Sequence, residues 1–190
     1  MTSLRQKRPI VSLPGRASPL AGVTRLQIHS FPPIASRLSQ VLILGTMPGK
    51  ASLRQRQYYA HPRNLFWPIL GEILGIDPAH PYEGRVAAVR SAGVAVWDVL
   101  RSCTRESSLD SDIDALSVVP NDFGAFLADH PQIRRICFNG ATAEVLYMRH
   151  VRPGLAAAPE IQHLRLPSTS PANASVPLTE KLRAWRSIVP

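Results

Sequence analysis

The chain has 190 residues, 45% of them hydrophobic, and a net charge of +9, which suits one domain with a sizeable core. No apolar run approaches the roughly 18 to 20 residues that span a membrane, and no signal-peptide segment follows the first residue. We therefore expect a cytoplasmic protein without a membrane partner. Its two cysteines, Cys103 and Cys137, form no CxxC pair, so they suggest neither a disulfide framework nor a structural zinc site, and they are too few for a four-cysteine iron–sulfur cluster. No metal and no cofactor are expected.

The positive charge is concentrated toward the N-terminus. Residues 1–71 contain ten Lys and Arg and no Asp or Glu, whereas the rest of the chain has 12 basic and 13 acidic residues. Charge alone is equally consistent with a generic aid to solubility. Its clustering favours nucleic acid, because a basic surface attracts phosphate and gains affinity by releasing counterions.

Residues 1–39 are expected to form a basic, partly disordered tail ahead of a single catalytic domain at 40–190. Five prolines interrupt any helix in the tail, and two glycines loosen it. The acid-free composition is also that of a mitochondrial transit peptide, but the spaced prolines spoil the amphipathic helix that such a peptide needs. Nonspecific tethering to DNA is the favoured role.

Strand and helix patterns alternate after the tail. Val41 begins a run of four apolar residues that Gly45 closes, which predicts a strand covered on both faces. Beyond Asn64 the apolar residues recur at the spacing of one helix face, so a helix is expected at 66–74. The other expected helices are 85–91, 123–128 with Asp122 as N-cap, 141–151 and 179–188; the other strands are 93–100, 133–138 and 161–166; and a polar loop is expected at 102–114.

This alternation predicts an α/β fold of three layers, α/β/α, around a central and mainly parallel sheet of about four strands. In such sheets ligands bind beyond the carboxyl ends of the strands. Four polar strand exits are expected to meet at that edge, at Gly45-Thr46-Met47, Asp98, Asn139-Gly140 and Ser168-Thr169-Ser170. The sequence therefore predicts a functional site there.

Two motifs at this edge carry a family resemblance. The first, GTMPG at 45–49, is not a phosphate-binding P-loop, because three residues rather than four separate its glycines and Ala51 follows Lys50. Together with YYAHPRNLFW at 58–67 and LPSTSPANAS at 166–175, it resembles the deoxyinosine (hypoxanthine) DNA glycosylases. These enzymes are a branch of the uracil-DNA glycosylase superfamily, and the resemblance covers roughly residues 41–185.

Asn64 is the expected catalytic residue. An Asn just ahead of a helical pattern is a favoured N-cap, and from the residues alone that structural role has the stronger claim. The resemblance reverses the preference, since the Asn of the HPRN motif is regarded as catalytic in the deoxyinosine branch. Related mismatch-uracil enzymes carry an Asn where this chain has Met47, which has no amide to bind water. Asn64 is able to cap the helix and present its amide to water together.

The resemblance implies that the rest of the first motif binds the base and the DNA. Tyr59 is favoured over Tyr58 as the ring on which an extruded base stacks, although either would serve as an ordinary packing residue. His61 either donates to a base or phosphate or holds the Pro62 turn. The other expected base-binding residues are Gly45, Thr46, Met47, Pro48, Gly49 and Asn139, and the expected DNA contacts in this motif are Lys50, Ser52 and Arg63.

The second motif is a loop of short polar side chains. Such a cluster is by itself only a loop signal, but the resemblance favours phosphate contacts from Ser168, Thr169, Ser170 and Asn173. Leu166 stands where other branches have His or Asn, and the loop holds no bulky side chain as an evident wedge for the emptied duplex. Asp98 is either a reserve base or, as we favour, a structural carboxylate that caps a backbone or pairs with an Arg.

The resemblance implies a monofunctional DNA glycosylase that flips out a deaminated base, most of all hypoxanthine, and cleaves the N-glycosidic bond by water attack. Neither motif places a lysine as a Schiff-base nucleophile, so no lyase step is expected. Two alternatives stay open: a uracil or thymine mismatch glycosylase, and a DNA-binding module that recognises a lesion without cutting. The expected partner is double- or single-stranded DNA with a damaged base, bound by a monomer.

Overall fold

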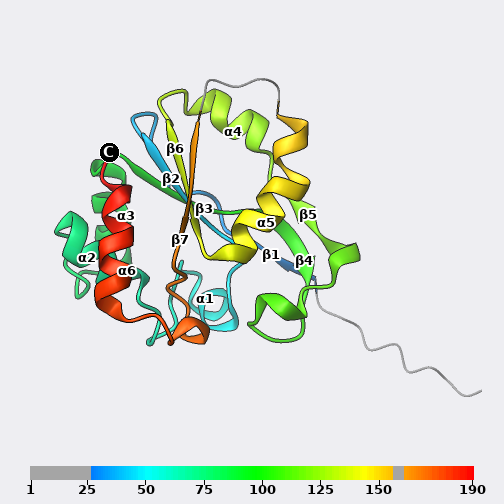
Figure 1. Ribbon diagram of the computed structural model, residues 1–190, viewed down its shortest axis with the longest axis horizontal. Coiled ribbons are helices and arrows are strands. Elements are labelled where there is room, and N and C mark those ends of the chain that lie inside the picture. The colour runs from blue at the N-terminus through cyan, green and yellow to red at the C-terminus, as the bar shows by residue number, and fades with distance from the viewer. Residues whose placement is uncertain (1–26, 156–160) are drawn as a thin grey trace, which may run out of the picture.

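A parallel sheet lies at the centre of the computed structural model, which describes residues 27–155 and 161–190 (Figure 1). Its strand order is β3-β2-β6-β7, and every neighbouring pair is parallel. The strands are β2 (Val41–Gly45), β3 (Val94–Asp98), β6 (Arg135–Asn139) and β7 (Gln162–Leu166). All residues of β2 and β3 are buried, as their continuous apolar runs predict.

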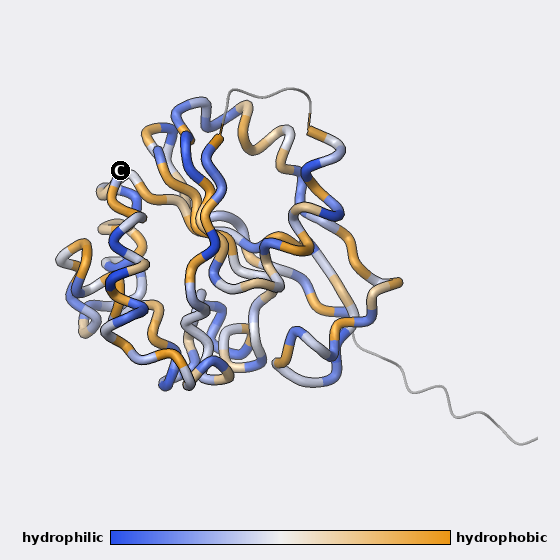
Figure 2. The backbone as a smooth tube through the Cα atoms, in the orientation of Figure 1, coloured by the Kyte–Doolittle hydropathy of each residue, from blue (hydrophilic) through white to orange (hydrophobic). Residues whose placement is uncertain are grey.

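Helices cover both faces of this sheet (Figure 1). On one side lie α2 (Phe66–Leu74), α3 (Tyr82–Ser91) and α6 (Leu178–Trp185), and on the other α4 (Phe123–Asp129) and α5 (Ala141–His150). Figure 2 shows hydrophobic segments where the central strands run through the middle of the molecule. The predicted three-layer α/β/α fold with a mainly parallel sheet is confirmed.

A second, antiparallel sheet was not predicted. It has the order β1-β4-β5 and consists of β1 (Gln27–His29), β4 (Leu100–Thr104) and β5 (Val119–Pro120). The strand expected at 93–100 is confirmed as β3 over Val94–Asp98, but its last two residues are wrong, because the chain leaves the parallel sheet after Asp98 and β4 pairs with β1 instead. The polar loop expected at 102–114 is wrong over its first three residues for the same reason. The rest of that segment passes over the carboxyl edge of the parallel sheet.

The segment assigned to the tail contributes to the fold from Gln27 onward. β1 pairs with β4, and Ile34 is buried in the core and forms a backbone bridge with Val96. Residues 1–26, the larger part of the expected tail, lie outside the described residues. Among the residues that are described, no helix is long and apolar enough to cross a membrane.

Most helix bounds agree with the sequence patterns. α2 matches the expected range, and the Asp122 side chain caps α4 by accepting from the Ala125 N–H at 3.0 Å. α3 begins three residues earlier than expected, and α6 ends at Trp185, where a 3₁₀ turn (Arg186–Ile188) follows. A short helix, α1 (Lys50–Gln55), lies where a continuous loop was expected. Its N-cap residue is Gly49, which has no side chain to cap the helix.

Candidate active site

The carboxyl ends of the parallel strands open into a cavity of about 960 Å³, a volume typical of small-molecule sites. Three loops form most of its walls, namely the first motif after β2, the segment after β4 and the second motif after β7, and the turn after β6 at 139–142 completes them. Figure 1 shows these loops together at the lower end of the molecule. Every residue that the sequence analysis named as catalytic, base-binding or DNA-binding lines this cavity. Their individual roles stay proposals.

Asn64 lies in the turn that connects the first motif to α2. Its Oδ1 accepts from the Phe66 N–H at 2.9 Å, so the side chain satisfies the first N–H of α2, although the residue at the N-cap position itself is Leu65. The turn is fixed on both sides, because the Asn64 N–H donates to the His61 carbonyl and the Leu65 N–H donates to the Thr169 carbonyl of the second motif. Within the described residues Asn64 makes no other side-chain hydrogen bond, which leaves one lone pair of Oδ1 and the two Nδ2 hydrogens for another partner. Capping and water binding are therefore compatible.

His61 shapes the same turn. Its Nδ1 accepts from the Arg63 N–H at 3.1 Å, so a neutral His61 carries its proton on Nε2. The ring lines the cavity, where this Nε2–H is available as a donor. The two roles expected for His61 are therefore compatible: Nδ1 holds the turn, and Nε2 stays suited to a contact with a base or phosphate.

The two adjacent tyrosines have different surroundings. Tyr58 is buried, and its hydroxyl donates to the Phe31 carbonyl at 3.1 Å, so it holds the segment between β1 and β2 in place. Tyr59 adopts a left-handed backbone conformation with φ of 55°, and one face of its ring stacks on Phe66 with centroids 3.8 Å apart. Both tyrosines line the cavity, but Tyr58 is buried with its hydroxyl engaged, whereas Tyr59 is half-buried, which supports its preference over Tyr58 as the stacking residue.

Asp98, Tyr59 and Gly45 meet at the inner end of the cavity. A Cβ atom on Gly45 would lie 2.6 Å from Asp98 Oδ1 and 2.8 Å from the Tyr59 hydroxyl oxygen. Only a glycine lets both oxygens come so close to the end of β2. Asp98 Oδ2 and the Tyr59 hydroxyl are buried and have no hydrogen-bond partner among the described residues. A polar ligand in the cavity would supply the missing partners.

Burial controls the protonation of Asp98 and Tyr59. It raises the pKa of Asp98 to about 8, the negative charge of Asp110 adds to the rise, and Arg105 opposes it. Burial and the nearby Asp98 also raise the pKa of Tyr59, and the neighbouring Asn139 side chain opposes this rise. At neutral pH Asp98 therefore mostly holds a proton and is able to donate as well as accept a hydrogen bond. The structural Arg pairing that we favoured for Asp98 is not observed in the described part of the chain.

We expect Asp98→Asn to flatten the pH dependence of stability. In the unfolded chain Asp98 has the ordinary aspartate pKa of about 3.9, whereas in the folded protein its pKa is about 8. Between these values the folded state binds more protons, so the free energy of unfolding falls as pH rises. Urea unfolding at about pH 5 and about pH 8 should show a smaller fall in the variant. Asp129→Asn, at an exposed position, is the control, and parallel slopes for wild type and Asp98→Asn would contradict the expectation.

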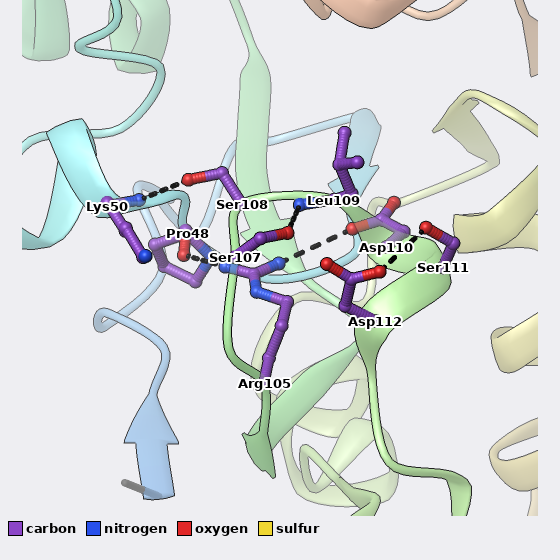
Figure 3. A network of polar contacts seen from close by, with 9 residues as sticks. All are labelled: Pro48, Lys50, Arg105, Ser107, Ser108, Leu109, Asp110, Ser111 and Asp112. Carbon is purple, nitrogen blue, oxygen red and sulfur yellow. Dashed lines mark hydrogen bonds and ion pairs between the residues drawn. The ribbon is translucent and has the colours of Figure 1, made fainter. Parts of the chain in front are cut away.

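The segment after β4 forms a wall that the sequence analysis missed. Arg105 is 7% exposed; its Nη2 donates to the Pro48 carbonyl at 2.7 Å, and its Nη1 lies 3.5 Å from Asp110 Oδ1. The Ser108 hydroxyl accepts from the Lys50 N–H at 3.0 Å. Figure 3 shows how these contacts attach the segment to the first motif. The sequence carried one signal for this wall: charged and hydroxyl side chains follow directly after a strand that ends beside the site.

The second motif is held by Asn139 and Lys181. The Asn139 amide donates from Nδ2 to Thr169 Oγ1 at 2.9 Å and accepts at Oδ1 from the Thr169 N–H at 2.8 Å. Lys181, from α6, is 1% exposed, and its Nζ donates to the carbonyls of Ser168 and Asn173, both at 2.8 Å. Lys181 was not among the residues expected at the site, because it has the spacing of a polar residue on an amphipathic helix.

Two residues expected to contact DNA are buried and form hydrogen bonds within the protein. Ser52 is 6% exposed and its hydroxyl accepts from the Ala60 N–H at 3.2 Å, while Thr169 is fully buried against Asn139. Lys50 and Arg63 are exposed and stay suited to phosphate. The burial of Ser52 and Thr169 favours a part in shaping the loops over direct contact with DNA.

Lys181→Met is expected to lower the free energy of unfolding by about 2 to 3 kcal/mol, because two carbonyls lose a charged donor while the apolar stem is kept. Chemical denaturation measures this loss. Lys50→Met, at an exposed position on α1, should change stability by less than about 0.5 kcal/mol. Equal stability of Lys181→Met and wild type would show that the second motif holds its shape without Lys181.

A family model of the uracil DNA glycosylase superfamily matches residues 32–188. The chain belongs to this superfamily. A hypoxanthine DNA glycosylase of Methanosarcina barkeri is 36% identical over 113 residues, which cover 59% of this chain and 70% of the relative. One from Methanosarcina acetivorans is 35% identical over 116 residues, which cover 60% of this chain and 72% of the relative.

A solved structure agrees with this assignment. The solution NMR structure of a candidate uracil DNA glycosylase from Methanosarcina acetivorans matches with a TM-score of 0.68 and 29% identity, covering 86% of this chain and 99% of the other. This superfamily member is therefore a DNA N-glycosylase and falls in the hypoxanthine (deoxyinosine) branch, as its motifs predicted. Within the described residues of the glycosylase, no three His, Cys, Asp or Glu side chains group together as a metal site would require.

Proposed function

We propose that this glycosylase removes a deaminated base, hypoxanthine above all, by hydrolysing the N-glycosidic bond of a flipped deoxyinosine. The observation that carries the proposal is the unsatisfied polar group at the inner end of the cavity, where the Tyr59 hydroxyl and Asp98 Oδ2 have no partner among the described residues. The names of the curated relatives support the same substrate.

Hypoxanthine offers the complementary groups. Its O6 and N7 accept hydrogen bonds and its N1–H donates one, so a protonated Asp98 would donate to the base with one oxygen and accept with the other. Tyr59 would donate from its hydroxyl or stack with its ring. Because Phe66 already covers one face of this ring, the opposite face is the one offered to the extruded base.

Asn64 would bind the attacking water. Cleavage develops positive charge on the sugar and negative charge on the leaving base, so donors placed against the base lower the barrier. The free lone pair of Asn64 Oδ1 would accept a hydrogen from water and orient its oxygen toward C1′. The cap bond to Phe66 keeps the amide in one orientation while it does so.

The DNA itself would be held around the cavity mouth. Lys50 and Arg63 are exposed there and would pair with phosphates on either side of the flipped nucleotide. The short side chains of Ser168 and Ser170 leave room for the backbone to approach the second motif. Binding through these groups should weaken as salt rises, while preference for the lesion should not depend on them alone.

The test is single-turnover base release from duplexes that contain deoxyinosine, deoxyuridine or no lesion. We expect fastest release from deoxyinosine and none from undamaged DNA. Release from deoxyuridine alone would assign the protein to the uracil or thymine mismatch glycosylases. Preferential binding of a lesion without release of any base would instead support a lesion-recognition module.

A further inference from the structure

Leu109 stands at the edge of the cavity with half of its side chain in solvent. It is 50% exposed and lines the cavity, whereas the other large exposed hydrophobic residues among the described ones, such as Leu116 at 98%, do not line it. A single exposed leucine on a surface needs no explanation. An exposed leucine at the mouth of a site for an extruded nucleotide is placed where the DNA must lie.

The backbone that carries Leu109 is fixed. Its N–H donates to the Ser107 hydroxyl at 2.8 Å, and its carbonyl accepts from the Asp112 N–H at 3.2 Å. On either side, Ser108 is bonded to the first motif and Asp110 pairs with the buried Arg105. Figure 3 shows the Leu109 side chain projecting away from the polar contacts that hold its backbone. These contacts therefore hold the backbone of the segment in place while the Leu109 side chain projects from it.

A flipped nucleotide leaves a gap in the stack that favours its return. Proteins that unstack DNA often insert an apolar side chain such as Leu, Ile, Met or Phe into the gap. The second motif does not supply one, because residues 168–173 are Ser, Thr, Ser, Pro, Ala and Asn. Leu109 has the required chemistry and lies on another wall of the same cavity.

We propose that Leu109 is the wedge that enters the DNA stack in place of the extruded nucleotide. The proposal rests on the proposed function, since it requires a base to be flipped from a duplex. Leu109 then acts on the opening of the duplex and not on the bond that is cleaved. Its contribution is confined to double-stranded substrates, because a single strand has no stack to hold open.

The experiment compares Leu109→Ala with wild type on the same deoxyinosine strand, once in a duplex and once alone. We expect the single-turnover rate to fall by about 10- to 100-fold on the duplex and to stay within about twofold on the single strand. Leu109→Met should restore most of the duplex rate, because it returns a long apolar side chain. Leu116→Ala, in the 3₁₀ turn Ala115–Ser117 and outside the cavity lining, is the matched control and should behave as wild type on both.

A second readout is independent of base release. With 2-aminopurine next to the lesion, fluorescence at saturating protein rises when the neighbouring base leaves the stack. We expect a smaller rise for Leu109→Ala than for wild type or Leu116→Ala. An unchanged duplex rate and an unchanged fluorescence rise would overturn the wedge, as would an equal loss of rate on duplex and single strand. Wild type that releases a base from neither substrate would instead refute the proposed function.

Discussion

Asn64→Ser is expected to lower single-turnover base release from deoxyinosine DNA by about 100- to 1,000-fold while the fold stays nearly as stable as wild type. Ser keeps a short side-chain oxygen for the Phe66 N–H, which Asn64 Oδ1 accepts in the structure. It loses the amide that we assign to the water. The variant therefore separates the two roles that the sequence left in competition at this position.

Asn64→Ala provides the comparison. It removes both the amide and the cap, so it should lose the same activity and also about 1 kcal/mol of stability. Urea unfolding and single-turnover rates on the same preparations measure the two effects. If Asn64→Ser retained activity within a few-fold of wild type, Asn64 would be a structural cap and the water would have to be bound elsewhere.

Gly45→Ala should impair both folding and catalysis. The added Cβ would meet Asp98 Oδ1 at 2.6 Å and the Tyr59 hydroxyl at 2.8 Å, distances at which atoms must move. Overpacking of this kind costs about 1 to 3 kcal/mol of stability. Displacement by even about 1 Å of the two groups that we propose to contact the base should lower the rate of base release by about 100-fold.

Gly84→Ala is the matched control for this prediction. Gly84 lies in α3, and the atom nearest to its added Cβ would be His80 Cβ at 3.7 Å, an ordinary contact. The variant should gain about 0.5 to 1 kcal/mol from helix propensity and keep wild-type activity. Thermal unfolding and the base-release rate decide both cases. Normal activity in Gly45→Ala would show that the close approach of Asp98 and Tyr59 to β2 is not needed.

Local pattern was sufficient for the parallel sheet and for the position of the site. The apolar run that begins at Val41 is long enough to predict a fully buried strand, and strand-helix alternation then places the polar strand exits at one edge. The same reasoning could not find the antiparallel sheet. β4 mixes buried and exposed residues, and its partner β1 lies about 75 residues away in a segment whose prolines predicted a tail.

Long-range polar contacts were equally out of reach of local pattern. Arg105 is 57 residues from the Pro48 carbonyl that accepts from it, and nothing near either residue in the sequence indicates the pair. Lys181 follows the spacing of a surface helix, yet it is buried because two carbonyls of the second motif accept from its Nζ. Tyr58 and Tyr59 are adjacent in sequence and both line the cavity, and only the tertiary packing engages the Tyr58 hydroxyl with a backbone carbonyl while it leaves that of Tyr59 without a partner among the described residues.

The most direct measurement is product analysis after one turnover of wild-type protein on a duplex with a single deoxyinosine. Chromatography quantifies the free base, and gel electrophoresis before and after alkali detects strand breaks. We predict one equivalent of hypoxanthine per duplex, an intact strand before alkali and cleavage only after it. Stoichiometric binding of the same duplex with no hypoxanthine released would contradict the assignment of this cavity to hydrolysis of the deoxyinosine glycosidic bond.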